Sequence, residues 1–416
     1  MPGSGLDCDV VIVGGGPGGG AFGRILARMG FEVIVLESSS EIHEQYRAEL
    51  IQPSSLTALE AAGVREPMVA GARHVAGMEV FGKRRRLFRV DYAELGEGTT
   101  LLSVPIHQTR AMLLRDNLPA GLTVRMGARV NGLVRDGDAV RGVTYRNTDR
   151  SLVTVRARLV VGADGRNSVV RRAAEIGATT KKYSVQIITM NAGGADWLSH
   201  LRLHVHDGRF MALAPATGGD VRMAWAIPTG EFGELRKRPI GDLVSELSRH
   251  ETYVSDWAAQ VTSWTDVHLQ PLNTAFAHTW ALDGLLLIGD AAHAVSPFGG
   301  QGLNMALHDS VIAAPIVADA MRRSDVPAGA VLGQLMGMRA ATCKGILKGG
   351  DLALTVFGPK FPGLVRETVM GFGGKVRGPN RIMLPKLALG SATVRGQLTE
   401  ASEQLAGLWA PVPTVS

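Results

Sequence analysis

Short apolar runs alternate with amphipathic stretches in the first part of the chain, a pattern that predicts buried parallel strands followed by helices. The first run, at 9–13, carries four apolar β-forming residues and leads straight into a glycine-rich turn. Apolar residues then recur at helical spacing over 21–29, Gly30 is placed to end that helix, and a second apolar run follows at 33–36. The order strand, turn, helix, strand within about 30 residues predicts a βαβ unit.

The pattern of an apolar strand followed by a turn occurs twice more, later in the chain. Apolar runs at 159–163 and 285–288 each end in a polar turn. Between them, residues 181–228 form short alternating runs separated by glycine turns, which predicts a mostly antiparallel second domain. Apolar residues recur at helical spacing after Pro105 and again in most of the C-terminal part. The further helices that we predict are 54–63, 240–247, 253–261, 314–322, 333–347 and 397–408.

Length and charge narrow the class of protein. With 416 residues the chain is long for a single core, so we expect two or three domains. The net charge of +6 raises the question of a nucleic-acid partner. However, the densest basic run, 83–86, has no interleaved aromatic residues and reads as a solvated hairpin edge, so we expect no such partner.

The chain also lacks signals of export, membrane insertion and metal binding. No window approaches about 18 uncharged apolar residues, so no membrane span is expected. The two cysteines, Cys8 and Cys343, give neither a disulfide framework nor a metal-ligand spacing. We therefore predict a cytoplasmic protein without a metal site.

The first glycine turn carries the most specific chemistry. In Gly14-x-Gly16-Pro17-x-Gly19, the first glycine allows a tight turn, the second lets the backbone approach a pyrophosphate and the third allows close packing of helix on strand. The second strand ends on Glu37, about 20 residues further on, where a carboxylate accepts hydrogen bonds from an adenosine ribose. A free ribose 2′-hydroxyl fits FAD or NAD better than NADP.

Two further turns add acidic residues. Asp164 follows the strand at 159–163 and can accept from a ribose or ribityl hydroxyl, or cap the next helix. Asp290 follows the strand at 285–288, and a Pro/Gly loop then leads to the amides of residues 302–304 at a helix start, a site suited to a negative pole. His293 lies between alanines, so we interpret it as a packing residue.

These three motifs together resemble the FAD-dependent aromatic hydroxylases, the p-hydroxybenzoate hydroxylase-like group A flavoprotein monooxygenases, over roughly residues 1–310. The resemblance implies that NADPH or NADH transiently reduces bound FAD, that O₂ adds to form a flavin C4a-hydroperoxide, and that one oxygen passes to the substrate. It also implies which residues contact the cofactor. These are Gly14, Gly16, Pro17, Gly19, Glu37, Arg47, Gln108, Asp164, Asp290, Gly302, Leu303 and Asn304.

The same resemblance implies the domain organisation. It predicts an α/β fold with a Rossmann-like FAD-binding domain of the p-hydroxybenzoate hydroxylase type, an α+β substrate domain that is mostly antiparallel, and a helical C-terminal segment. The FAD-binding domain is predicted from 1–75, 105–180 and 275–330, the substrate domain from 76–104 and 181–274, and the C-terminal segment from 331–416.

The expected substrate is a small, largely apolar molecule, aromatic or polyketide-like, that is hydroxylated or epoxidised in secondary metabolism or aromatic breakdown. Candidate substrate contacts are His206, Phe210, Trp225 and Pro297. No catalytic side chain is assigned, although His204, His206 and His278 are candidate bases. Nothing distinguishes a monomer from a homodimer.

Three other flavin functions stay open. A flavin-dependent halogenase carries Trp-x-Trp-x-Ile-Pro, of which this chain has only half, in 223–228. A non-redox FAD-containing cyclase and a flavin reductase acting on isoprenoid double bonds would keep the same cofactor motifs. Chloride dependence distinguishes the halogenase, and consumption of reductant without O₂ distinguishes the reductase.

Overall fold

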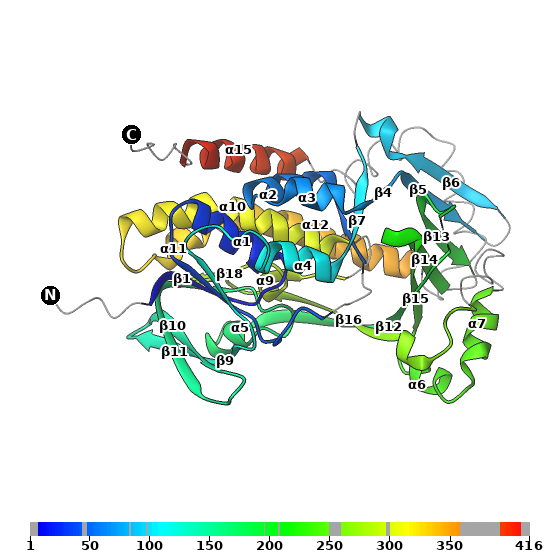
Figure 1. Ribbon diagram of the computed structural model, residues 1–416, viewed down its shortest axis with the longest axis horizontal. Helices are drawn as coiled ribbons and strands as arrows, with labels where there is room; N and C mark the ends of the chain where they lie inside the picture. The colour runs from blue at the N-terminus through cyan, green and yellow to red at the C-terminus, as the bar shows by residue number, and fades with distance from the viewer. Residues whose placement is uncertain are drawn as a thin grey trace.

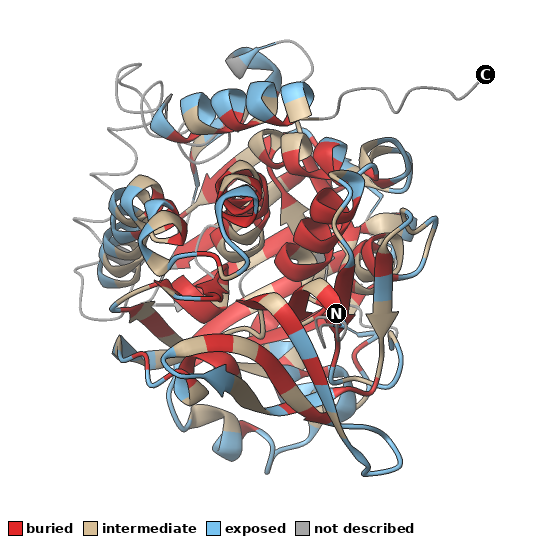
Figure 2. Cartoon of the chain, turned by 90° about the vertical axis from the view of Figure 1, so that its left-hand side faces the viewer, coloured by how far each residue is buried: buried red, intermediate tan, exposed pale blue. Residues whose placement is uncertain are grey.

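The computed structural model describes residues 7–43, 48–82, 85–96, 99–194, 196–206, 209–248, 259–296, 300–357 and 392–408. Figure 1 shows a parallel sheet with helices stacked on it at one end of the molecule and a second large sheet at the other. Buried residues are concentrated in the central strands and the helices next to them, and exposed residues lie on the outer loops and helix faces (Figure 2).

The parallel sheet is built around β1 (Cys8–Val13). β1 pairs in parallel with β2 (Val33–Leu36) on one side and β11 (Leu152–Gly162) on the other. Because helices cover the sheet, the paired positions 10–13, 33–36 and 159–161 are continuously apolar and buried rather than alternating. Outward from this centre lie β8 (Leu122–Arg125), β18 (Leu285–Leu287) and β17 (Ala281–Leu282), while β9 (Arg129–Asp136) and β10 (Ala139–Arg146) extend β11 as a hairpin.

Two helices at the centre of the molecule begin at the predicted cofactor motifs and pack against each other. α1 (Pro17–Arg28) packs against α10 (Gln301–Arg323). α10 begins near residues 302–304, where the sequence predicts a helix start, and it includes the predicted helical stretch at 314–322. Its first turns are buried against α1 and β3 (Ala48–Ile51). The other helices of this part are α2 (Leu56–Ala61), α3 (Arg65–Ala70), α4 (Ile106–Leu114), α5 (Val169–Ala173) and α9 (Asp290–His293), with the 3₁₀ turn η1 (Pro53–Ser55).

The second sheet has the strand order β16-β12-β15-β14-β13-β5-β6. Only the β13–β5 pair is parallel, so the prediction of a mostly antiparallel sheet is confirmed. The strands are β5 (Gly77–Phe81), β6 (Arg86–Asp91), β12 (Ala178–Ala192), β13 (His200–His206), β14 (Arg209–Pro215), β15 (Val221–Pro228) and β16 (His268–Ala277).

The two faces of this sheet pack against different partners. One face forms a core with α6 (Glu231–Leu235) and α7 (Ile240–Ser248). The other packs toward a small sheet of β3 (Ala48–Ile51), β7 (Leu101–Pro105) and β4 (Arg73–Val75). The predicted helix at 253–261 lies mostly outside the described residues. The remaining short elements are η2 (Tyr92–Leu95), η3 (Thr217–Gly219) and η4 (Trp264–Asp266).

The C-terminal helices join both parts of the molecule. α11 (Gly329–Leu332), α12 (Gln334–Phe357) and α15 (Ala392–Leu408) all pack on elements of the first part, α15 against α10 and α2 (Figure 1). α12 also reaches the second sheet, where Asp351 pairs with Lys181 at 2.8 Å and accepts the Tyr183 hydroxyl. The predicted helical segment is confirmed, whereas the numbered domain boundaries stay a prediction.

Candidate cofactor and substrate site

The first glycine turn lies between the carboxyl end of β1 and the start of α1. Gly14 has φ +108°, and a Cβ built on it would lie 2.4 Å from the Ala163 carbonyl oxygen. A Cβ on Gly19 would lie 2.1 Å from the Gly14 carbonyl oxygen. Gly16, by contrast, caps α1 with Pro17 as the first helical residue, and nothing lies within 4 Å of its Cβ position. Gly14 and Gly19 therefore maintain packing, and the open space beside Gly16 can receive a ligand.

Glu37 is held against this turn. Its Oε2 accepts the Gly15 amide at 2.8 Å, and its Oε1 accepts the Ser39 amide at 2.8 Å. Burial acts to raise the pKa of Glu37, but these amides and the nearby guanidinium of Arg110 together hold that pKa below its usual value. Glu37 is therefore a carboxylate at neutral pH, as a ribose-binding acid requires.

Arg110 on α4 is a residue that the sequence did not identify. Its guanidinium lies 3.3 Å from Glu37 Oε2 and donates to the Gly15 carbonyl oxygen at 3.2 Å. The predicted contact Gln108 lies in the first turn of the same helix and is half-buried. Arg110 belongs to no sequence motif. The sequence shows only that a cationic residue follows Gln108 by two positions, about half a helical turn.

Asp164 has the capping role that the sequence left open. Its Oδ2 accepts the amides of Val169 and Val170 at 2.6 and 3.1 Å, and its Oδ1 accepts the Ser168 hydroxyl at 2.5 Å. Ser168 in turn is the N-cap of α5. Both carboxylate oxygens thus bind within their own loop, and a contact between Asp164 and the cofactor stays a prediction.

Two arginines, one from the Asp-Gly loop (residues 164–168) and one from the helix α5 that follows it, reach the Gly-Asp turn (residues 289–293). Arg171 donates to the Ala291 carbonyl oxygen at 2.7 Å. Arg166 donates to Asn273 of β16 at 2.8 Å, to the Val295 carbonyl oxygen at 3.0 Å, and lies 3.5 Å from Asp290 Oδ2. Arg166 therefore connects the second sheet to the turn that carries Asp290.

The Gly-Asp turn and the start of α10 lie side by side. A Cβ on Gly302 would lie 3.7 Å from Asp290 Oδ1. Ala306 contacts both turns, because Cβ atoms built on Gly18 and Gly289 would lie 2.9 and 3.0 Å from the Ala306 Cβ. The structure thus brings the glycine turn, the Asp-Gly loop and the Gly-Asp turn together at the carboxyl ends of β1, β11 and β18.

Asn304 is fully buried, and its amide is used entirely within the protein. Its Oδ1 accepts the Gln52 amide and the Ser55 hydroxyl, both at 2.8 Å. Its Nδ2 donates to the carbonyl oxygens of Leu50 at 2.9 Å and Gly300 at 2.8 Å. The side chain therefore ties the start of α10 to β3, which leaves the amides of the first turn, with half-buried Leu303, as the groups that can face a ligand.

The predicted substrate residues do not share one surface. Phe210 packs with Val80 on the face of the second sheet that lies toward β3. Trp225 is opposite Met211 in the strand pairing and is fully buried under α6 and α7, on the other face. Phe210 and Trp225 therefore cannot line the same wall. Pro297 and Arg47, together with the side chain of His206, lie outside the described residues.

The described candidate bases also lie away from Phe210. His204 stacks on Phe81 with ring centroids 5.0 Å apart, on the Trp225 face. His278 is exposed at the far end of β16, where it lies 3.3 Å from the Thr179 hydroxyl. Among the described residues, then, no histidine of that set points toward the face of Phe210.

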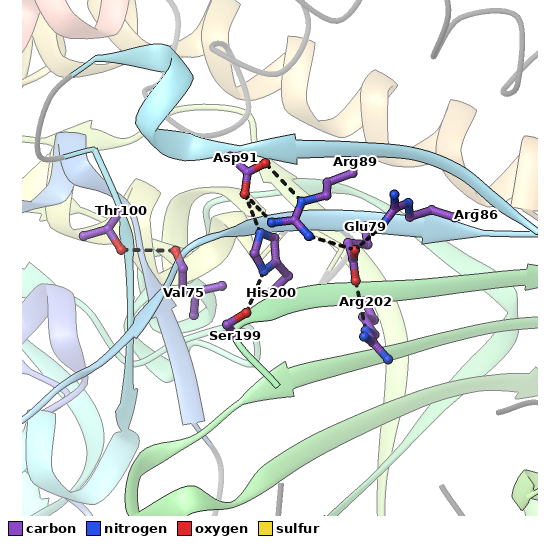
Figure 3. Close-up of polar contacts among 9 residues, drawn as sticks. All are labelled: Val75, Glu79, Arg86, Arg89, Asp91, Thr100, Ser199, His200 and Arg202. Carbon is purple, nitrogen blue, oxygen red and sulfur yellow. Dashed lines mark hydrogen bonds and ion pairs between the residues drawn. The ribbon is translucent and has the colours of Figure 1, made fainter. Parts of the chain in front are cut away.

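A cluster of charges occupies the outer part of the Trp225 face (Figure 3). Glu79 accepts from Arg86 at 2.9 Å and Arg202 at 3.0 Å, and Arg89 Nη1 lies 3.5 Å away. Asp91 links Arg89 to His200 at 2.8 and 2.7 Å. The strand pairing places Arg202, Glu79 and Arg89 side by side, so the cluster joins β13, β5 and the edge strand β6.

We expect a Glu79→Gln substitution to lower the free energy of unfolding by about 1–3 kcal/mol, because it removes the carboxylate that three guanidinium groups share. Glu79 is only 5% exposed, whereas Glu234 is 67% exposed in its pair with Lys237. Urea unfolding of Glu79→Gln and of the control Glu234→Gln measures the difference. Equal stability of the two variants would contradict a structural role for the cluster.

The fold and the site together define a dinucleotide-binding flavoprotein. A parallel βαβ unit, a glycine turn with open space at a helix start, a ribose-type carboxylate and a second helix start at the same sheet edge suit FAD. Among the described residues no cluster of His, Cys, Asp or Glu could hold a metal ion, and no helix there is both long and apolar enough to cross a bilayer.

Comparison with known proteins gives the family. Residues 7–328 match the family described as "FAD binding domain". The chain is 34% identical over 329 residues to 6-methylpretetramide 4-monooxygenase of Streptomyces rimosus, covering 78% of each, and 26% identical to protoasukamycin 4-monooxygenase of Streptomyces nodosus, covering 77% and 82%. The solved structure of PqsL, a probable FAD-dependent monooxygenase from Pseudomonas aeruginosa, is 25% identical with a TM-score of 0.75, covering 87% of this chain and 99% of that one.

The chain belongs to the FAD-dependent aromatic hydroxylase family, and its fold is that of the p-hydroxybenzoate hydroxylase type. It is an FAD-dependent oxidoreductase of the monooxygenase class, with NAD(P)H the usual reductant of the family.

Proposed function

We propose that this enzyme uses FAD, NADPH or NADH, and O₂ to hydroxylate or epoxidise a small, largely apolar substrate, aromatic or polyketide-like. One observation supports the cofactor site most directly. Three motifs that are far apart in the sequence lie together at one edge of the parallel sheet, and no atom lies within 4 Å of the Cβ position of Gly16. The relatives named for 4-monooxygenation of 6-methylpretetramide and protoasukamycin support the substrate class.

Each motif would hold one part of FAD. The amides at the start of α1, beside Gly16 and Pro17, face the pyrophosphate, and Glu37 accepts from the adenosine ribose. Asp290 accepts from the ribityl chain, and the amides of residues 302–304 face the negative pole of the flavin ring. Bound FAD supplies the two-electron and oxygen chemistry, so no side-chain nucleophile is needed.

The substrate is proposed to bind between the start of α10 and the Phe210 face of the second sheet. That face carries Phe210 with Ala212 and Ala226, and it leads through Leu50 to the α10 start, because Leu50 packs on it and its carbonyl accepts from Asn304. An apolar wall of this kind excludes water and favours an apolar ring system. Trp225, on the opposite face, would support the sheet instead.

The experiment that tests this function is anaerobic reduction of the purified holoprotein. We expect the flavin absorbance to bleach when NADPH or NADH is added and to return, with peroxide or oxygenated product, when air is admitted. Flavin that stays oxidised with every candidate substrate would favour the non-redox cyclase. A protein that cannot be reconstituted with FAD would contradict both functions. The cytoplasmic location and the monomeric or homodimeric state stay predictions.

A further inference from the structure

A buried carboxylate lies directly beneath the turn that carries Asp290. Asp309 of α10 is fully buried, and its Oδ2 accepts both the Gly289 amide at 2.9 Å and the His293 ring at 2.5 Å. Gly289 caps α9 and His293 is its last residue. One oxygen atom of Asp309 therefore holds both ends of the short helix that begins with Asp290.

The other oxygen of Asp309 is bound by a residue from the C-terminal segment. Arg339 of α12 donates its Nε to Asp309 Oδ1 at 2.9 Å, and both side chains are 0% exposed. α12 begins at Gln334, beyond the residues 7–328 that match the family. No motif in the sequence marked Arg339. A segment that the family match does not reach thus contributes to the support of the Gly-Asp turn.

The charge of Arg339 matters because a carboxylate at this depth is ionised only with cationic partners. Burial acts to raise the pKa of Asp309, but His293 and Arg339 hold that pKa well below its usual range. An ionised Asp309 makes charge-assisted hydrogen bonds to the Gly289 amide and to the His293 ring, which are stronger than neutral ones. The guanidinium therefore acts on the turn through the carboxylate.

We propose that Arg339 is a positioning residue of the FAD site, which acts through Asp309 to hold the turn 289–293 in the conformation that presents Asp290 to the cofactor. This inference rests on the proposed role of Asp290. It also gives the C-terminal segment a function, because α12 then forms part of the cofactor site rather than a cover for the sheet.

The test compares Arg339→Gln, Arg339→Lys and the control Lys348→Gln, an exposed residue of the same helix. Titration of each apoprotein with FAD gives the dissociation constant, and thermal unfolding without FAD gives the stability of the fold. We expect Arg339→Gln to weaken FAD binding at least about tenfold, and Arg339→Lys, which retains the charge, to bind within about threefold of wild type. Lys348→Gln should match wild type.

The outcomes separate this inference from the proposed function. Equal FAD affinity in wild type and Arg339→Gln overturns the positioning role alone, and so does an Arg339→Lys variant as weak as Arg339→Gln. A wild-type protein that does not bind FAD overturns the proposed function itself.

A second variant covers the case in which Arg339→Gln does not fold. The double variant Asp309→Asn/Arg339→Gln leaves no unpaired carboxylate or guanidinium at the pair, so it is expected to fold. Its amide makes only neutral hydrogen bonds to the turn, and we expect FAD binding at least about tenfold weaker than wild type. Wild-type affinity in the double variant overturns the proposal.

Discussion

A Gly14→Ala substitution is expected to abolish FAD binding and to lower the free energy of unfolding by at least about 4 kcal/mol. The added Cβ would lie 2.4 Å from the Ala163 carbonyl oxygen and 2.8 Å from the Asp164 Cα, both of them backbone atoms. Gly14 also has φ +108°, a conformation that alanine rarely adopts. The loop cannot relax without moving β11, so the whole edge of the parallel sheet is disturbed. Urea unfolding and FAD titration measure the two effects.

Gly16→Ala is the matched control, because it adds the same methyl group two residues away. Its Cβ position has no atom within 4 Å and its φ is −74°. We therefore expect the variant to unfold like wild type while its affinity for FAD falls, since the methyl group would occupy the proposed path of the pyrophosphate. Unchanged FAD binding in Gly16→Ala would place the cofactor elsewhere.

An Asp309→Asn substitution is expected to lower the free energy of unfolding by about 3–5 kcal/mol near pH 6, because it leaves the buried Arg339 without an anionic partner. Asp319→Asn, on the same helix but half exposed in its pair with Arg323, is the control and should change stability by less than about 0.5 kcal/mol. Chemical denaturation of both variants across pH measures the effect. A loss as small as that of the control would show that the buried pair contributes nothing.

The pH dependence of this difference follows from the direction of the pKa shifts. Burial acts to lower the pKa of His293, but Asp309 and, secondly, Cys343 of α12 raise that pKa well above 6.5. The stability from His293 is therefore fully present below about pH 6.5 and is lost as the pH rises through the folded-state pKa. Asp309 has a lowered pKa, so its contribution is present above about pH 4 and is lost in acid.

The difference in free energy of unfolding between wild type and Asp309→Asn should thus be largest between about pH 4 and 6.5. Above that window it should narrow by up to about 1.4 kcal/mol per pH unit, because the wild type alone gives up a proton that stabilises its fold. A difference that stays constant above about pH 6.5 would mean that His293 is neutral in the folded wild type.

The two faces of the second sheet cannot be predicted from the sequence of one strand at a time. The sequence suggests both Phe210 and Trp225 as substrate contacts, but the pairing of β14 with β15 puts the two side chains on opposite faces. Which face a residue of one strand shares with a residue of another depends on register, and register is set by the whole sheet. The same pairing places the candidate base His204 on the Trp225 face.

The cofactor motif and the fold that carries it can be predicted from the amino-acid sequence alone. Glycines that need positive φ or close backbone approach, an uncharged strand buried on both faces and a carboxylate at a strand end are local requirements, so they can be read from neighbouring residues. By contrast, the three-dimensional packing determines that Asp164 caps α5, that Arg110 reaches Glu37 and that Arg339 pairs with Asp309. Each of these polar side chains could bond to several partners. Its actual partner depends on packing, which removes water and brings residues that are distant in the sequence within hydrogen-bond distance.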